Sequence, residues 1–406
     1  MRQNNIGTAS AGTGTAGRGS ALALIFSTFA MMASFVIWNV FPPIAGKIQE
    51  LFQLTTVQKS ILIATPVLLG SIVRIPMGIY TDRLGGRKVF AVTMLFLALP
   101  LLLAGWTDSF GFMLLCALMI GMAGTTFAIS LTYVSRWYPP EKQGFVLGLA
   151  GLGNIGGAVA SFTVPVISAN YGLSWVFWGL AIMIVLVTVI FWFFTSDLPA
   201  PAQHKTFKQS LSVLKFKSTW MLSLFYFLTF GGFVAFSVYL PTFLKECFGL
   251  TATDAGLKTA GFILVATLIR PLGGYWADRM GSQKVLVIVF GGTGLTALML
   301  AFSLESLPYF SVGCLVTAAL LGLGNGAVFK MVPEVSSANT GAVTGIVGAA
   351  GGLGGFFPPI VLGLIKNATG GYMLGFVLLM VFACVCLWMN RLAGQMRQER
   401  QAAAAG

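Results

Sequence analysis

The stretch 60-SILIATPVLLGSIVRIPMGIYTDRLGGRK-88 decides the fold, because it places one arginine inside an apolar run long enough to cross a bilayer. Arg74 cannot lose its charge in a protein. An arginine at the centre of a transmembrane helix costs at least about 2.5–3.5 kcal/mol on insertion scales. We therefore predict that Arg74 faces a cavity and has a function. Asp82 follows eight residues later, about 12 Å along a helix, which places it at the membrane edge.

Residues 261–284, GFILVATLIRPLGGYWADRMGSQK, repeat this arrangement 196 residues further on. Arg270 again precedes an aspartate, Asp278, by eight residues, and Gly78 and Gly274 each lie four residues before their aspartate. A repeat at nearly half the chain length indicates a tandem duplication. In membrane proteins such halves are commonly related by an axis along the membrane normal. The two arginines should then face each other across that axis.

The composition is typical of a multi-span membrane protein. Hydrophobic residues make up 57% of the chain and charged residues 9%, whereas soluble domains carry about 25% charged residues. We predict an all-α membrane protein with twelve transmembrane helices in two pseudo-symmetric six-helix halves. The predicted spans are 20–42, 59–80, 89–107, 111–134, 145–167, 175–195, 219–244, 259–279, 285–304, 309–330, 342–366 and 372–391.

Most lysines and arginines fall in one alternate set of the predicted loops, and such loops are cytoplasmic. The net charge of +13 therefore reflects topology and does not indicate nucleic-acid binding. Both termini should be cytoplasmic. The predicted domains are a disordered cytoplasmic tail (1–19), an N-terminal bundle (20–195), a cytoplasmic linker (196–218), a C-terminal bundle (219–391) and a cytoplasmic tail (392–406). A short amphipathic helix on the membrane over 206–217 is an alternative to a plain solvated linker.

The chain offers little for enzymatic or metal chemistry. It has one histidine, and its five cysteines have spacings that suit neither a disulfide framework nor a metal site. No cluster of carboxylates falls inside the predicted spans. We expect no cofactor, no metal and no enzymatic activity.

Glycines are dense in the fifth predicted span, GLAGLGNIGGAVASFT at 148–163. Gly151-x-Gly153-x-x-Gly156 matches a dinucleotide-binding fingerprint, but that motif requires a preceding strand. In a membrane span, glycines let helix backbones approach closely, and Asn154 offers an amide in the membrane interior. Helix packing alone is the alternative explanation. The eleventh span repeats the pattern, and the glycines that we assign to gating or helix packing are Gly151, Gly153, Gly156, Gly157, Gly348, Gly351, Gly352, Gly354 and Gly355.

The pattern Gly78-x-x-x-Asp82-Arg-x-Gly-Gly-Arg-Lys resembles the loop signature of the major facilitator superfamily, and a second copy ends at Asp278-Arg-x-Gly-Ser-Gln-Lys. Gly86 stands where that signature commonly has a basic residue, so the pairing within this loop departs from the pattern. We expect Asp82 and Asp278 to latch onto neighbouring helices and brace the state that is closed toward the cytoplasm.

Phe127 in the fourth span and Phe230 in the seventh lie early in the two halves, at places that we interpret as corresponding. Packing in the core or against lipid is the alternative for each. Four segments together resemble the nitrate/nitrite porter (NarK-type) family of the major facilitator superfamily, over residues 20–391. They are Arg74-Ile-Pro, Gly153-Asn154-Ile-Gly-Gly, Tyr226-x-x-x-Phe230 and Gly348-A-A-Gly-Gly-L-Gly-Gly-Phe.

This resemblance implies that Arg74 and Arg270 bind the anion directly, that Phe127 and Phe230 sandwich it, and that Asn154 and Tyr226 add hydrogen bonds. It also implies nitrate and nitrite as substrates. Contact with membrane lipid, a bacterial inner membrane and a monomer are further expectations.

The predicted spans contain no carboxylate near the midplane. Two unpaired buried arginines are electrostatically costly, and a bound anion would lower that cost. Exchange of nitrate for nitrite follows naturally. Proton-coupled nitrate symport is the alternative, although relay carboxylates are usual in proton pathways. A carrier of another small anion and a non-transporting nutrient sensor are two further alternatives.

Overall fold

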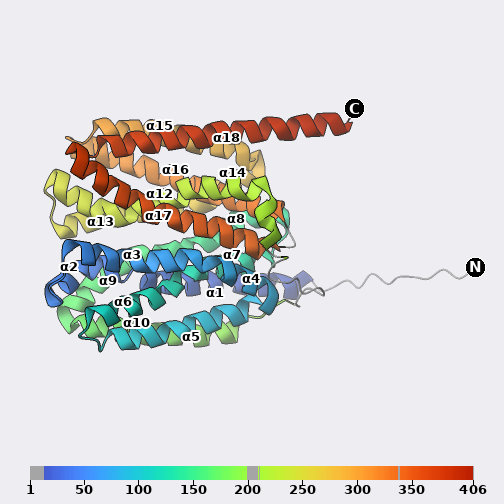
Figure 1. Cartoon of the computed structure of the whole chain (residues 1–406). Helices are drawn as coiled ribbons and strands as arrows, with labels where there is room; N and C mark the ends of the chain where they lie inside the picture. The colour runs from blue at the N-terminus through green and yellow to red at the C-terminus, as the bar shows by residue number, and fades with distance from the viewer. Residues whose placement is uncertain (1–12, 199–208, 210, 337–338, 406) are drawn as a thin grey trace, which may run out of the picture.

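The computed structural model describes residues 13–198, 209, 211–336 and 339–405. In this part of the chain every regular element is helical. The helices form two bundles that lie side by side along their length (Figure 1).

The first bundle contains α1 (Thr13–Trp38), α2 (Phe41–Leu51), α3 (Thr56–Ile72), α4 (Arg74–Leu84), α5 (Gly86–Ala104), α6 (Phe110–Ile120), η1 (Gly121–Thr125), α7 (Thr126–Ser135), η2 (Pro140–Lys142), α8 (Gln143–Ala150), η3 (Gly151–Ile155), α9 (Gly156–Tyr171) and α10 (Leu173–Phe194). The second contains η4 (Leu211–Lys215), α12 (Lys217–Phe248), α13 (Ala252–Leu268), α14 (Arg270–Met280), α15 (Ser282–Phe302), α16 (Leu307–Val335), α17 (Thr340–Thr369) and α18 (Met373–Ala405). The η elements are 3₁₀ helices.

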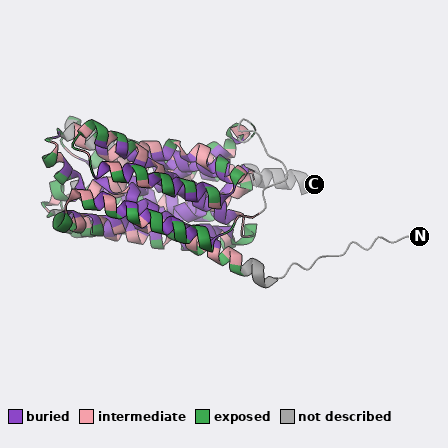
Figure 2. Cartoon of the chain, turned by 90° about the horizontal axis from the view of Figure 1, so that it is seen from below, coloured by how far each residue is buried: buried purple, intermediate pink, exposed green. Residues whose placement is uncertain are grey.

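The prediction of twelve membrane-spanning helices is confirmed, since twelve described helical segments are long and apolar enough to cross a bilayer. Buried residues run through the middle of the molecule and exposed residues line its outside (Figure 2). Many outward side chains are large and apolar, such as Phe193 at 77% exposure and Phe302 at 72%. Such a surface suits a hydrocarbon environment and not water.

The ends of the predicted domains differ from the structure. α1 begins at Thr13, so residues 13–19 are helical and the prediction of a disordered tail is wrong for them; residues 1–12 lie outside the described residues. The linker prediction falls partly on 199–208 and 210, which also lie outside. Its described part includes the 3₁₀ helix η4. At the other end, α18 continues the last span through residues 392–405.

The second and eighth spans are built alike. Thr55 caps α3 by accepting a hydrogen bond from the backbone of Gln58, and Thr251 caps α13 in the same way. Each span is then interrupted one residue before its arginine, at Val73 and at Ile269. A proline follows each break, at positions 76 and 271, and removes one intrahelical backbone donor. Both arginines therefore stand at the first position of a new helical segment.

The fourth and fifth spans each contain a 3₁₀ stretch in their middle, η1 and η3. Both stretches coincide with glycine-rich sequence, GMAGT and GLGNI. Their counterparts in the second bundle, α16 and α17, are unbroken helices. The duplication is therefore less regular in structure than in sequence, because the tighter 3₁₀ turns occur in one half only.

Candidate functional site

Arg74 lies between the two bundles and is completely buried. Its Nε atom donates to the carbonyl oxygen of Gly124 in η1 at 2.9 Å, and its Nη1 atom donates to the carbonyl oxygen of Gly348 in α17 at 2.7 Å. The Nη2 atom has no hydrogen-bond partner. One guanidinium therefore bridges the halves and still offers a free donor.

Arg270 is equally buried, at 1% exposure, but is held more loosely. Its Nη2 atom donates to the Tyr226 hydroxyl at 3.4 Å, and its Nε and Nη1 atoms have no partner. Among the described residues, the buried charged side chains are those of Arg74 and Arg270, and no Asp or Glu side chain is buried. Two positive charges in the interior therefore have no carboxylate beside them.

Aromatic rings surround both guanidiniums. The Cζ atom of Arg74 lies 5.0 Å from the Phe127 ring centroid and 5.3 Å from that of Phe230. The Cζ atom of Arg270 lies 5.2 Å from the same Phe127 ring. Cation–π attraction at such distances stabilises a cation that water cannot reach. The Phe127 ring of the fourth span therefore lies beside both arginines, Arg74 of the second span and Arg270 of the eighth.

The Phe127 and Phe230 rings contact each other directly, with centroids 5.4 Å apart and planes tilted by 32°. A planar anion between two rings needs about 7 Å, because each face-to-face contact takes about 3.5 Å. In this conformation the rings leave no room for a sandwiched ligand. They must separate before an anion can lie between them.

Phe329 in α16 belongs to the same cluster and was missed by the sequence reasoning. Its ring centroid lies 4.7 Å from that of Tyr226 and 5.3 Å from that of Phe127, and Arg270 lies over it at 5.7 Å. Gly326-Ala-Val-Phe329 repeats Gly124-Thr-Thr-Phe127. Phe329, and not Phe230, is therefore the counterpart of Phe127 in the second half. This Gly-x-x-Phe repeat is the signal that could have identified it.

Asn154 lies in η3 at 3% exposure, and its Oδ1 atom has no hydrogen-bond partner. In a 3₁₀ helix, side chains three residues apart lie one above the other. Asn154 is thus aligned with Gly151, where an added Cβ would meet the side chain of Arg270. The amide therefore lies on the face of η3 that packs toward Arg270.

The glycines of the two motifs divide into two groups by what they touch. At Gly348 a Cβ would come 3.3 Å from Cδ of Arg74, and at Gly352 it would meet Ser71, so both lie against the other half. Gly151 also lies against the other half, since an added Cβ there would meet the side chain of Arg270. The remaining glycines face parts of their own half. Gly153 and Gly156 face α1, and Gly157 faces Asn39 just after it, whereas Gly351, Gly354 and Gly355 face α12.

The two halves are also joined at the end of the bundle where α1 begins and α18 ends, which we call the terminal face (Figure 1). There the Asp82 carboxylate of α4 accepts a hydrogen bond from the backbone N–H of Gly341, at the start of α17, at 2.8 Å. A carboxylate at a helix N-terminus is favourable because that end carries partial positive charge.

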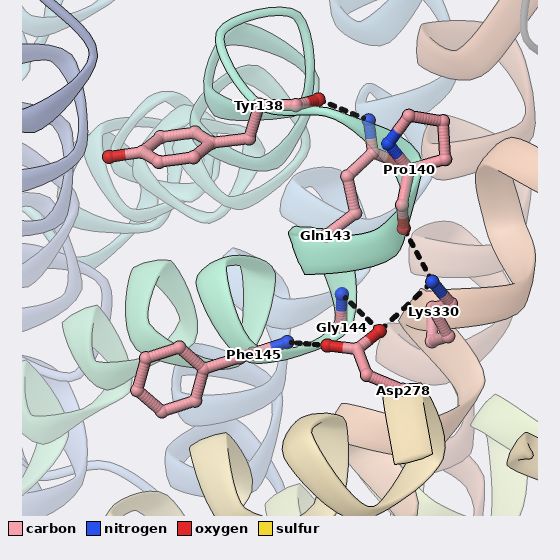
Figure 3. A network of polar contacts seen from close by, with 7 residues as sticks. All are labelled: Tyr138, Pro140, Gln143, Gly144, Phe145, Asp278 and Lys330. Carbon is pink, nitrogen blue, oxygen red and sulfur yellow. Dashed lines mark hydrogen bonds and ion pairs between the residues drawn. The ribbon is translucent and has the colours of Figure 1, made fainter. Parts of the chain in front are cut away.

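Asp278 of α14 makes the corresponding contact in the opposite direction (Figure 3). Its carboxylate accepts from the backbone N–H groups of Gly144 at 3.2 Å and Phe145 at 2.9 Å, at the start of α8. Lys330 of α16 lies 2.9 Å from Asp278 and donates to the carbonyl oxygen of Pro140 at 2.5 Å. Each aspartate thus accepts hydrogen bonds from the start of a helix of the other half, at the terminal face.

Comparison with known proteins identifies this architecture. The sequence profile described as Major Facilitator Superfamily matches residues 23–256 and 222–405. The chain belongs to the major facilitator superfamily. Within it, the chain is 39% identical over 375 residues to the nitrite extrusion protein of Bacillus subtilis, covering 90% of this chain and 93% of that one. This likeness places it in the nitrate/nitrite porter family, as the sequence resemblance implied.

Other members of the superfamily are more distant or are similar in fold alone. Proteins named "Probable nitrate transporter NarT" from Staphylococcus epidermidis and Staphylococcus aureus are 35% and 36% identical, over 90% and 91% of this chain and 94% of each of theirs. The human organic anion transporter MFSD10 (TETRAN) has a TM-score of 0.76 at 16% identity, covering 92% of this chain and 99% of its own. The transporter FucP in its outward conformation has a TM-score of 0.71 at 18% identity, covering 91% and 99%.

Membership of this superfamily makes the chain a multi-pass membrane transporter and not an enzyme. The buried arginine pair then lies where the two halves of a transporter meet. Residues from three spans of the first half (the second, fourth and fifth) and four of the second half (the seventh, eighth, tenth and eleventh) converge there. Transporters with two such halves commonly have their binding sites between them.

Proposed function

We propose that this transporter carries nitrate and nitrite across the bacterial cytoplasmic membrane by alternating access, and that it exchanges one anion for the other. The observation that carries the proposal is the buried pair of arginines. Together they present three nitrogen atoms without hydrogen-bond partners, Nη2 of Arg74 and Nε and Nη1 of Arg270. The names of the relatives support the same substrates.

The chemistry of the site favours a small planar oxyanion. Guanidinium groups present planar N–H donors that match the geometry of oxyanions, and they stay charged at any physiological pH. The site is confined by Gly348 and Gly351, where an added methyl group would contact Arg74 and Tyr226. A longer carboxylate would need space that these contacts do not leave.

Each residue predicted from the sequence has a role in this proposal. Arg74 and Arg270 bind the anion, and Phe127 and Phe230 flank it once their rings have separated. Tyr226 already accepts a hydrogen bond from Arg270, so it can orient that guanidinium toward the anion. Asn154 adds an amide from η3, on the face nearest to Arg270.

Exchange, and not proton symport, is the coupling that the charges favour. Proton pathways through membrane proteins use intramembrane carboxylates or histidines, and none of the described Asp or Glu side chains is buried. Lys330 is engaged by Asp278 and Pro140 at the terminal face and does not serve the central site. An empty carrier keeps two uncompensated charges, whereas a bound anion neutralises one and permits the halves to move.

We assign the terminal face to the cytoplasmic side, because the loops at that end carry most of the lysines and arginines. The conformation described is then closed toward the cytoplasm, held by the latches of Asp82 and Asp278. Alternating access requires both latches to open as the opposite side closes.

The test is anion exchange in proteoliposomes, with internal nitrite and external labelled nitrate. We expect uptake that requires internal nitrite and does not respond to a pH gradient. Arg74→Lys and Arg270→Lys should each lower exchange by at least about a hundredfold, because lysine keeps the charge and loses the planar fork. Arg391→Lys, at an exposed position of α18, is the matched control and should transport normally.

Two results would contradict the proposal. Nitrate uptake that needs a proton gradient and no internal nitrite would replace exchange by symport. Full exchange by both folded lysine variants would show that the arginines have a structural role only.

A further inference from the structure

A second buried amide lies in the membrane interior, in the other half from Asn154. Asn325 of α16 is 2% exposed, and its Oδ1 atom has no hydrogen-bond partner. No hydrogen bond joins this side chain to any described residue. Buried polar groups are nearly always paired in proteins, and an unpaired one calls for an explanation.

Asn325 lies at the level of Arg270. The next residue, Gly326, packs so closely on α14 that an added Cβ would meet the carbonyl oxygen of Arg270. The residues on both sides of Asn325, Gly324 and Gly326, have no side chains. The amide is therefore not screened by its neighbours in the chain, and it stands beside the helix that carries one of the two arginines.

Asn325 also shares a helix face with an aromatic residue of the site. Residues four apart in an α-helix lie one above the other on the same face, so Asn325 lies one turn from Phe329. Phe329 contacts Tyr226, Phe127 and Arg270. Asn325 therefore faces the same interior as these side chains, on the side of Phe329 away from the terminal face.

We propose that Asn325 is a further substrate-binding residue that helps the transporter to distinguish nitrate from nitrite. This inference rests on the proposed function and adds to it a residue of the second half. When the site is loaded, Oδ1 can accept a hydrogen bond from an unpartnered arginine N–H, and Nδ2 can donate to an oxygen of the anion. Both ends of the amide are then satisfied.

The selectivity follows from the number of oxygens. Nitrite has two and nitrate has three, in one plane. Donors on the two arginines can meet two oxygens of either anion, so an additional donor matters most for the third oxygen of nitrate. A site discriminates strongly against a ligand that leaves one of its buried polar groups without a hydrogen-bond partner. It discriminates only weakly against a ligand that merely fits loosely.

The experiment measures KM for nitrate and for nitrite separately in proteoliposomes, for the parent and for Asn325→Ala. Loss of a hydrogen bond to a charged ligand should raise KM for nitrate by about tenfold or more. We expect KM for nitrite to rise by less than about threefold, because nitrite lacks the third oxygen for which this donor matters most. The ratio of the two constants is the decisive quantity, because a purely structural defect would move both equally.

Asn390→Ala is the matched control. Asn390 is as buried as Asn325 and also has an unpartnered Oδ1 atom, but its Nδ2 atom donates to the carbonyl oxygen of Gln283. It should leave the KM ratio unchanged. Should Asn325→Ala not fold, Asn325→Leu keeps the side-chain volume and should show the same change in ratio.

An unchanged ratio in a variant that folds and exchanges anions would overturn this inference and leave the proposed function intact. A parent protein that exchanges neither nitrate nor nitrite would overturn both.

Discussion

Arg74 and Arg270 occupy equivalent positions in the internal repeat but have different surroundings. Arg74 is fixed by two backbone carbonyls, one from each half, whereas Arg270 has a single long hydrogen bond to Tyr226. Reorienting Arg270 toward an anion breaks fewer contacts. We infer that Arg74 is the anchored member of the pair and that Arg270 adjusts its position on anion binding.

Phe329→Leu tests the aromatic support of Arg270. The ring lies under the guanidinium at 5.7 Å, and cation–π contacts contribute about 0.5–2 kcal/mol depending on desolvation. We expect KM for nitrate to rise by about three- to tenfold, measured by counterflow in proteoliposomes. The same change at Phe302, which is 72% exposed on α15, should have no effect. Equal KM values for the parent and Phe329→Leu would show that the ring only fills space.

At the scale of elements, two rows of glycine join the halves between the terminal face and the arginines. In the fifth span, Gly144, Gly148 and Gly151 lie against α14; in the eleventh, residues 341, 345 and 348 lie against α4. Both rows have the same spacing, 197 residues apart. Backbone-to-backbone contact allows the helices to close without interdigitated side chains, and therefore also to part without rearranging them.

Gly274→Ala tests this contact. A Cβ at position 274 would meet the carbonyl oxygen of Gly144 in the other half, and backbone cannot move aside as a flexible side chain can. We expect α8 and α14 to be forced apart, exchange to fall by at least about tenfold, and amide hydrogen exchange to rise over residues 143–150.

Gly291→Ala is the matched control, because no atom lies within 4 Å of an added Cβ there. It should transport normally and gain about 0.5–1 kcal/mol of helix stability. Normal transport by Gly274→Ala with unchanged hydrogen exchange at α8 would contradict the role of the glycine rows.

At the scale of the whole molecule, each half supplies a carboxylate that caps a helix of the other half. Asp82 caps the start of α17 and Asp278 caps the start of α8. The second latch is reinforced by Lys330, which binds both Asp278 and Pro140 (Figure 3). The closed terminal face is therefore held by a few polar contacts at its rim and by the glycine rows beneath them.

Lys330→Met removes the ion pair and the bond to Pro140 while keeping an unbranched side chain. Fewer molecules should then occupy the state closed at the terminal face. Apparent affinity for an anion offered from the opposite side falls in proportion to that occupancy. We expect a two- to fivefold rise in that KM, on the order of the contribution of one partly exposed ion pair. Lys88→Met, exposed at the same face, is the control. A KM equal to that of the parent would show that the ion pair does not bias the conformational equilibrium.

Much of this architecture could be predicted from the chain alone, because membranes impose strict physical constraints. Burying a guanidinium in an apolar helix is so costly that Arg74 and Arg270 can be recognised as functional candidates from the sequence. The repeated spacing of arginine and aspartate around them predicts two halves. Asn154 was found for the same reason, as an amide in a membrane span. Asn325 satisfies the same criterion, between two glycines of the tenth span, and was overlooked.

Aromatic residues were harder to predict. The chain contains 34 phenylalanines, and apolar side chains carry no cost that distinguishes a binding ring from a lipid-facing one. Phe230 was therefore paired with Phe127 although Phe329 is the counterpart in the repeat. Similarly, nothing in the glycine motifs distinguishes η3, which is a 3₁₀ helix, from the regular turns of α17.

The sequence by itself determined the twelve spans, the duplication and the arginine pair, because hydrophobicity and charge act locally along a helix that crosses a bilayer. Only the tertiary structure decided which groups meet. It showed that Arg74 bridges to Gly348 while Arg270 keeps two free nitrogens, that Phe127 lies beside both, and that the rings are closed on each other. These are relations between helices far apart in the chain, and they arise from packing, which no local pattern encodes.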